Sequence, residues 1–125
     1  MIRILTEEAP RPLGPYSQGI KVGNLIFASG QLGIDPLTGE LKESFEEEVR
    51  QAFRNLEAIL KGGDSDLKKV VKLTVFLSDL SLFPTFNQIC EEVFEKVYPA
   101  RECVEVSALP LKARVEISAI AWSQA

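Results

Sequence analysis

Residues 70–77 read Val-Val-Lys-Leu-Thr-Val-Phe-Leu and are the clearest strand pattern in the chain. One face of this strand would carry the side chains of residues 71, 73, 75 and 77, and the other would carry those of residues 70, 74 and 76. Both sets are largely apolar, and a strand that is apolar on both faces is expected to be covered on both. The fold is therefore predicted to form around residues 70–77.

A helix is predicted to follow this strand from about Leu82 to Val97, because apolar residues recur at helical spacing. Pro84 is compatible with that helix, since it falls in the first turn, and Pro99 is predicted to stop it. Two further strands, at about Arg101–Ala108 and Val115–Trp122, are expected to end the chain.

The residues before the central strand predict a hairpin and a long helix. Gln18–Val22 and Leu25–Ser29 have strand composition and are joined by Gly-Asn, a pair suited to a tight turn with positive φ. Residues 2–5 suggest a short edge strand, and residues 35–39 a turn. Ser44 and Glu47 form a capping-box pattern at the start of the helix, and Lys61 with Gly62-Gly63 marks its end.

This order of elements predicts one α+β domain over residues 1–125. Strand-helix-strand units favour parallel pairing with right-handed crossovers, which would place both helices on one face of a mixed sheet. The opposite face is expected to expose Val70, Phe76 and Cys103 or their neighbours on that face. An exposed apolar face of that extent indicates a partner, so we expect a homo-oligomer whose sites can straddle subunits.

The composition excludes several kinds of chemistry. The 125 residues carry a net charge of −4, which argues against a nucleic-acid-binding protein. There is no histidine, and Cys90 and Cys103 are the only cysteines, so neither a metal site nor catalysis by a histidine base is indicated. No apolar run is long enough to span a membrane, and no secretion signal is evident, so a cytoplasmic protein is expected.

Arg101 and Glu116 are the candidate functional side chains. A guanidinium at the start of a strand presents paired donors that match the two oxygens of a small carboxylate. The alternative for Arg101 is an ordinary ion pair with Glu102 or Glu105. Glu116 is a carboxylate on an otherwise apolar strand, where it either serves chemistry or is a structural acid with a backbone or Arg partner.

The chain resembles the reactive-intermediate deaminase family, also called the YjgF-like or Rid family, over essentially its whole length. The motifs that carry the resemblance lie at residues 13–19 (LGPYSQG), 28–32 (ASGQL), 70–80 (VVKLTVFLSDL), 99–106 (PARECVEV), 109–110 (LP) and 115–117 (VEI), together with Asn87. The resemblance implies a chorismate-mutase-like fold and a homotrimer with sites in clefts between subunits. It also implies hydrolysis of imines such as 2-iminopropanoate and 2-iminobutanoate, with neither a metal nor an organic cofactor.

The resemblance gives Arg101 and Glu116 specific roles. Arg101 matches the family's substrate-binding arginine and is expected to clamp the substrate carboxylate. Glu116 matches the family's acid and is expected to hold or activate the attacking water, with a pKa raised by partial burial. Ser118 departs from the pattern, because many relatives carry a second acid at that place, and this leaves local electrostatics and substrate preference open.

Five further residues are expected to bind substrate, each with a structural alternative. Tyr16 would line the site or hydrogen-bond the leaving nitrogen, or else pack at an interface. Ser29 and Gly30 would supply a hydroxyl and a closely approaching backbone, or form only a turn. Asn87 would contact ligand or anchor a loop. Cys103 is expected to line the site through its backbone N–H and not to act as a nucleophile, since its strand looks buried and no base is near in sequence.

Three other functions compete with imine hydrolysis. The same arginine could bind 2-oxo acids or other small carboxylates in a regulatory module without turnover. An RNA-cleaving translation inhibitor is a label given to some relatives, but the acidic balance and the missing histidine disfavour it. A chaperone that uses exposed apolar surface is the remaining alternative.

Overall fold

The computed structural model describes residues 1–123. Residues 70–77 form a strand in it, next to one edge strand of a six-stranded sheet. The strands are β1 (Ile2–Ile4), β2 (Gly19–Val22), β3 (Leu25–Gln31), β4 (Val70–Leu77), β5 (Ala100–Glu105) and β6 (Val115–Trp122), and the helices are α1 (Phe45–Gly62) and α2 (Phe83–Phe94). Short 3-10 turns precede β4, α2 and β6.

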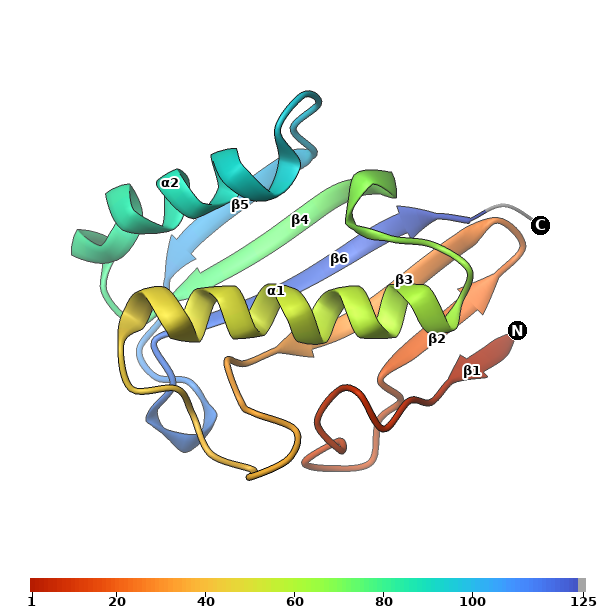
Figure 1. Ribbon diagram of the computed structural model, residues 1–125, viewed down its shortest axis with the longest axis horizontal. Coiled ribbons are helices and arrows are strands. Elements are labelled where there is room, and N and C mark those ends of the chain that lie inside the picture. Colours follow the sequence, from red (N-terminus) through yellow and green to blue (C-terminus); the bar gives the residue numbers. More distant parts are fainter. Residues whose placement is uncertain (124–125) are drawn as a thin grey trace.

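The sheet has the order β1-β2-β3-β6-β4-β5. β4 and β5 pair in parallel, whereas every other neighbouring pair is antiparallel. α2 is the crossover between the two parallel strands, and α1 connects β3 to β4 across β6, which lies between them. Both helices cover the same face of the sheet (Figure 1). The predicted α+β fold, with a mixed sheet and two helices on one face, is confirmed.

The core lies between the sheet and the two helices, and a bulge in β4 changes which residues enter it. Leu73, Val75 and Leu77 face the helices and are fully buried. The pairing of β4 with β6 shifts register between Val70 and Lys72. Consequently Val70 is buried and Val71 is exposed, so the prediction that Val70 belongs to the uncovered face was wrong.

α1 begins and ends as its sequence predicts. The hydroxyl of Ser44 accepts a hydrogen bond from the backbone N–H of Glu47, 3.1 Å away, which satisfies one of the free donors of the first turn. At the other end the N–H of Gly63 donates to the carbonyl of Leu60. α1 contacts α2 through Phe53, whose ring centroid lies 6.0 Å from that of Phe86 and 5.7 Å from that of Phe94.

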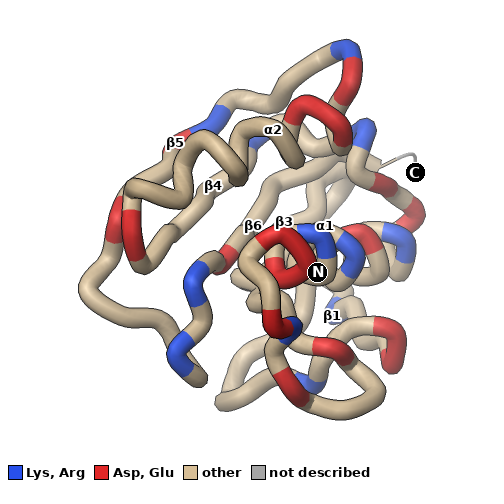
Figure 2. The backbone as a smooth tube through the Cα atoms, turned by 60° about the vertical axis from the view of Figure 1, so that its left-hand side comes forward, with Lys and Arg blue, Asp and Glu red and all other residues tan. Residues whose placement is uncertain are grey.

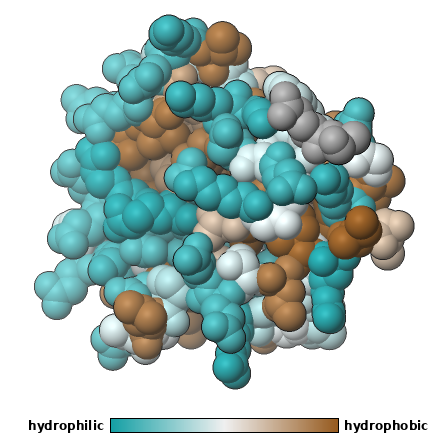
Figure 3. Space-filling view, turned by 45° about the vertical axis from the view of Figure 1, so that its right-hand side comes forward, coloured by the Kyte–Doolittle hydropathy of each residue, from teal (hydrophilic) through white to brown (hydrophobic). Residues whose placement is uncertain are grey.

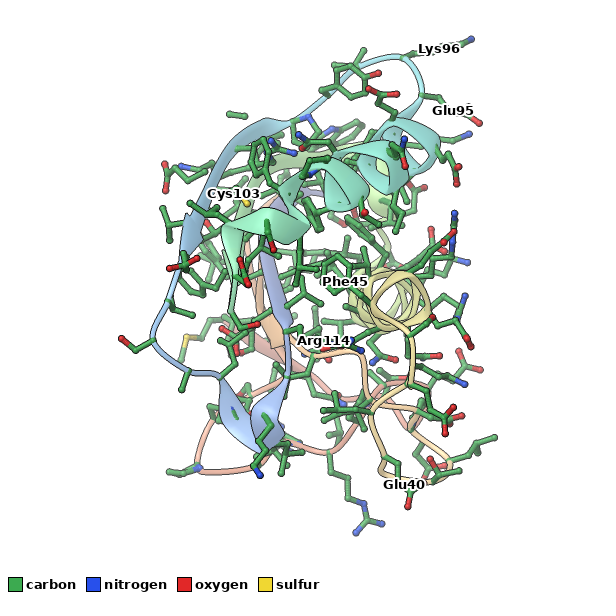
Figure 4. All side chains as sticks on the ribbon, turned by 90° about the vertical axis from the view of Figure 1, so that its left-hand side faces the viewer. Glu40, Phe45, Glu95, Lys96, Cys103 and Arg114 are labelled. Carbon is green, nitrogen blue, oxygen red and sulfur yellow. The ribbon has the colours of Figure 1, made fainter. Side chains whose placement is uncertain are left out.

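α2 is shorter than predicted. It ends at Phe94, three residues before the predicted end at Val97, because Glu95 adopts a positive φ of 49°. Val97, expected in the apolar stripe, is 82% exposed in the loop that follows, and Figure 4 shows Glu95 and Lys96 in this projecting loop. β5 also ends three residues earlier than predicted, at Glu105. Within residues 1–123, neither helix combines the length and the hydropathy of a membrane span.

The face of the sheet opposite the helices exposes apolar side chains. Phe27, Val104 and Trp122 are each more than 40% exposed, and they alternate with the residues that face the core. Cys103, which was expected on this face, instead packs against the core on the helix side, where Figure 4 shows it between β5 and α2. Apolar side chains are also exposed toward the two chain ends, among the brown patches at the right of Figure 3.

Two buried polar side chains of α1 hold the loops at one end of the sheet. Glu48, only 1% exposed, accepts hydrogen bonds from the backbone N–H and the Nε of Arg114, both at 2.7 Å. The guanidinium of Arg114 also lies 5.8 Å from the ring of Phe45, beside it in Figure 4. Asn55 is fully buried and donates to the carbonyls of Leu32 and Ile34. These contacts attach the ends of β3 and β6 to α1.

Replacing Glu48 is expected to destabilise the fold strongly. Glu48→Ala should lower the free energy of unfolding by about 3 kcal/mol, because it leaves the Nε and the backbone N–H of Arg114 without their acceptor. The matched control is Glu46→Ala, which removes an exposed ion pair with Arg50 and should cost about 0.5 kcal/mol or less. Urea unfolding of both variants measures the difference; equal losses would show that the Glu48–Arg114 contact is not important for stability.

Candidate active site

Glu116 lies against a bulge in the neighbouring strand. It is carried by β6 on the face opposite the helices, and β3 shifts register between Ala28 and Gln31, so that Ser29 and Gly30 form the irregularity. A Cβ added to Gly30 would lie 2.7 Å from Cδ of Glu116. Only glycine therefore lets the carboxylate lie directly over this backbone.

The Glu116 carboxylate opens into a cavity of about 700 Å³. The loop before β2 forms the other wall, with the side chain of Tyr16 among its lining residues, and Ser29 and Gly30 line the cavity too. The Tyr16 hydroxyl accepts a hydrogen bond from the N–H of Leu13 at 3.0 Å, which leaves its own hydrogen free to donate. The Ser29 hydroxyl donates to the carbonyl of Ser17 at 2.6 Å, so its hydrogen bonds to the loop before β2.

Burial raises the pKa of the Glu116 carboxyl above its ordinary value, because desolvation disfavours the charged form. None of the ion pairs formed among residues 1–123 includes Glu116. No hydrogen bond to its side chain is formed among these residues either, so neither the backbone partner nor the Arg partner of the structural alternative is present in the described part of the chain. A half-buried carboxyl with a raised pKa is a candidate general acid or base.

Arg101 is held by neutral groups. Its guanidinium lies 5.4 Å from the ring of Phe83 and 5.8 Å from that of Phe86, and its Nη1 donates to Oδ1 of Asn87 at 2.8 Å. Asn87 thus orients the arginine, whereas the sequence suggested either a ligand contact or a loop anchor. The hydrogen bond and the aromatic rings position the guanidinium and leave its charge unneutralised.

The carboxylates that were the alternative partners of Arg101 have other contacts. Glu102 pairs with Lys72 at 2.7 Å, and Glu105 accepts from the backbone N–H of Leu80 at 2.8 Å. Among residues 1–123, no acidic side chain forms an ion pair with Arg101. The guanidinium is therefore available to a carboxylate from outside the protomer.

Both cysteines lie close to Arg101, but neither is activated. Burial raises the pKa of the Cys90 thiol to about 11, and it also raises the pKa of the Cys103 thiol, although Arg101 opposes both shifts. A raised thiol pKa disfavours the thiolate, which agrees with rejecting Cys103 as a nucleophile. The expectation that the strand of Cys103 is buried was wrong, because β5 is an edge strand with mostly exposed residues.

The backbone N–H of Cys103 points to the open edge of the sheet. The N–H of Val106 donates to the carbonyl of Leu77 on β4. Peptide groups along a strand alternate in direction, so the N–H three residues earlier points away from β4. This orientation is compatible with the expected contact of Cys103 with a ligand.

Arg101 and Glu116 lie on opposite faces of the sheet within one protomer. Arg101 is in register with Leu73, which is in register with Ala119 beneath the helices. Glu116 is in register with Phe76, three residues from Leu73 and therefore on the other face. The structure thus places the predicted site residues in two candidate half-sites: Tyr16, Ser29, Gly30 and Glu116 around one cavity, and Asn87, Arg101 and Cys103 on the other side.

Residues 6–123 match the family model described as Endoribonuclease L-PSP. The chain belongs to this family, the reactive-intermediate deaminase or YjgF-like family. It is 48% identical to a RutC family protein of Pyrococcus abyssi over 122 residues, 97% of this chain and 96% of that protein. It is 45% identical to the 2-iminobutanoate/2-iminopropanoate deaminase of Bos taurus over 119 residues, 94% of this chain and 87% of that protein.

The fold is that of solved family members. The structure of Escherichia coli TdcF with bound serine superposes with a TM-score of 0.95 at 35% identity, covering 99% of this chain and 100% of that chain. The resemblance stated from the sequence motifs is confirmed. The name of the Bos taurus relative shows that the family includes imine deaminases.

Gln18, in the family's LGPYSQG stretch, has a structural role that sequence reasoning missed. Its side chain is 2% exposed; its amide donates to the carbonyls of Thr6 and Pro10, and its carbonyl accepts from the N–H of Thr6. These bonds hold the loop that forms one wall of the Glu116 cavity. The partners lie 8 to 12 residues earlier in an irregular segment, so no sequence periodicity points to them.

The raised pKa of Glu116 predicts a pH-dependent cost to stability. A carboxyl whose pKa is raised on folding supports stability below its unfolded pKa, and this contribution is lost as pH rises through the folded pKa. Glu116→Gln should therefore be more stable than the wild type at pH 8, and the difference should shrink toward pH 4. Urea unfolding across this range measures the gap; a gap that does not change with pH would contradict the burial argument.

Proposed function

We propose that this protein hydrolyses 2-imino acids, such as 2-iminopropanoate and 2-iminobutanoate, to 2-oxo acids and ammonia. The observation that carries the proposal is the guanidinium of Arg101, held by Asn87 and two phenylalanine rings with no carboxylate partner among the described residues. The name of the Bos taurus relative supports the same substrates.

Arg101 would orient the substrate by accepting its carboxylate in a two-pronged contact. A planar guanidinium matches both carboxylate oxygens, and each charge-assisted hydrogen bond is worth about 1.5–3 kcal/mol when water is excluded. The N–H of Cys103 at the sheet edge would donate a further hydrogen bond. Such positioning suits a reaction that already proceeds slowly in water.

Glu116 would move the protons. The carboxylate accepts a proton from water as the water oxygen bonds to the imine carbon, and the C=N electron pair moves to nitrogen, which is protonated. The resulting carbinolamine then forms its C=O bond as the C–N bond breaks and ammonia leaves with the second proton. The raised pKa of Glu116 makes its carboxylate a better proton acceptor than an exposed one.

The complete site would form between subunits of a homotrimer. Arg101 and Glu116 lie on opposite faces of the sheet, so one protomer does not bring them together. The uncovered face beside Glu116 exposes Phe27, Val104 and Trp122, an apolar surface that a second copy would bury. Packing this face against a neighbouring subunit would place Arg101 of one protomer beside Glu116 of the next.

A carboxylate-binding module without turnover is the second candidate. It is favoured by one observation, that the TdcF structure contains bound serine, an amino acid with the carboxylate but no imine. The family description names an endoribonuclease, but basic and acidic segments alternate along this backbone in Figure 2 and the net charge is −4. These features disfavour RNA cleavage by this protein.

Removing the clamp should abolish acceleration. With 2-iminopropanoate and 2-iminobutanoate generated in situ, Arg101→Met should lower kcat/KM about 100-fold, because two charge-assisted bonds are lost. Arg101→Lys should retain part of the activity, since it keeps the charge without the planar fork. The control is Arg54→Met, because Arg54 is exposed on α1; this variant should keep the wild-type kcat/KM. If the wild type itself does not accelerate imine hydrolysis, the result favours the carboxylate-binding module.

Mixed oligomers test whether the site is shared. If each site takes Arg101 from one protomer and Glu116 from the next, random mixing of Arg101→Ala and Glu116→Gln chains should restore about one quarter of the wild-type sites. Each variant alone should be inactive. Ammonia release is measured after mass spectrometry has verified mixed trimers; if they form and remain inactive, the inter-subunit site is wrong.

A further inference from the structure

Arg11 lies where two hollows of the surface meet. It lines the cavity of about 700 Å³ that contains Glu116, and it also lines a neighbouring hollow of about 660 Å³. Pro12, Gly14, Pro15 and Tyr16 belong to both linings, so the two are continuous along this loop. Arg3 of β1 lines the second hollow together with Ser17, which adds a second guanidinium and a hydroxyl.

The charges of Arg11 and Arg3 are not used within the protomer. Among residues 1–123, the side chains of these two arginines form no ion pair or hydrogen bond, whereas Arg50 pairs with Glu46 and Glu92 and Arg54 donates to Gln51. In a chain with a net charge of −4, unpaired guanidiniums along one hollow create a local preference for an anion.

The acidic content of the cavity is low. Of the described residues that line it, Glu116 is the only one with a carboxylate. Ser118, two residues along β6 on the same face, is neutral. A second negative group on a ligand could therefore bind Arg11 without repulsion from an acidic side chain other than Glu116 among the lining residues.

The cavity is larger than a small imino acid requires. 2-Iminobutanoate has seven non-hydrogen atoms, which fill about 200 Å³ even if each takes a water's share of ~30 Å³. About two thirds of the 700 Å³ would then remain beyond the substrate, and Arg11 is among the residues that line this cavity. This leaves room for a longer side chain.

We propose that the site accepts 2-imino acids with a second carboxylate, and that Arg11 recognises the distal carboxylate. The proposal rests on the proposed function, since it assigns the substrate class of the same site. Arg101 would hold the carboxylate next to the imine carbon, and Arg11 would bind the other with paired donors, assisted by the field of Arg3. Hydrolysis is unchanged: water adds to the imine carbon, ammonia leaves, and the distal carboxylate takes no part.

Binding of two matched 2-oxo acids tests the proposal without requiring turnover. 2-Oxoglutarate and 2-oxopentanoate have the same five-carbon chain and differ in the distal carboxylate. Calorimetry should show that the wild type binds 2-oxoglutarate more tightly, and that Arg11→Met weakens 2-oxoglutarate about 10-fold more than 2-oxopentanoate. Arg54→Met is the matched control and should leave the ratio of the two affinities unchanged, because Arg54 lies on α1.

Turnover separates failure of this inference from failure of the proposed function. If the wild type accelerates 2-iminobutanoate hydrolysis but Arg11→Met weakens both oxo acids equally, or neither, Arg11 does not select dicarboxylates. If imine hydrolysis is not accelerated, the proposed function fails, while the affinity ratio still decides the role of Arg11. Urea unfolding checks that each variant is folded. Arg11→Lys should recover part of the affinity ratio between 2-oxoglutarate and 2-oxopentanoate if charge contributes.

Discussion

The position of β6 between β3 and β4 is the constraint on which the rest of the structure depends. This C-terminal strand supplies the neighbour that both earlier strands need, and it joins the hairpin half of the sheet to the helical half. Its alternate residues Val115, Ile117 and Ala119 are buried beneath the helices. Because side chains alternate along a strand, Glu116 between Val115 and Ile117 must lie on the other face. One register therefore sets both the core and the candidate catalytic acid.

Buried polar contacts translate that register into a shaped cavity. Glu48 holds Arg114 at the entry to β6, and Gln18 holds the loop opposite Glu116. Gly30 lets β3 pass directly beneath the carboxylate. Glu48 and Gln18 have no contact with substrate in the proposed mechanism, but they fix the entry to β6 and the loop that lines the cavity, and the cost of leaving buried donors unpaired keeps both in place.

The two half-sites explain why this fold would act as an oligomer. The pleat of the sheet separates Arg101 from Glu116, and no rotation of side chains brings groups from opposite faces together. A modest catalyst is sufficient for imine hydrolysis, so orientation by Arg101 and proton transfer by Glu116 account for the proposed activity. The apolar face beside Glu116 would then serve both assembly and catalysis.

The sequence by itself determined most elements and supplied the candidate residues of both half-sites. Apolar periodicity, the Ser44 cap and the turn glycines are local signals, and they predicted α1, the hairpin and β6 because neighbouring residues alone decide them. Local signals placed the end of α2 too late and Val70 on the wrong face, since a positive φ at Glu95 and a bulge in β4 depend on packing. Only the tertiary structure decided that Arg101 has no acidic partner among residues 1–123 and is separated from Glu116 by the sheet. That outcome follows from strand order, which joins residues far apart in the chain and leaves no mark in local sequence.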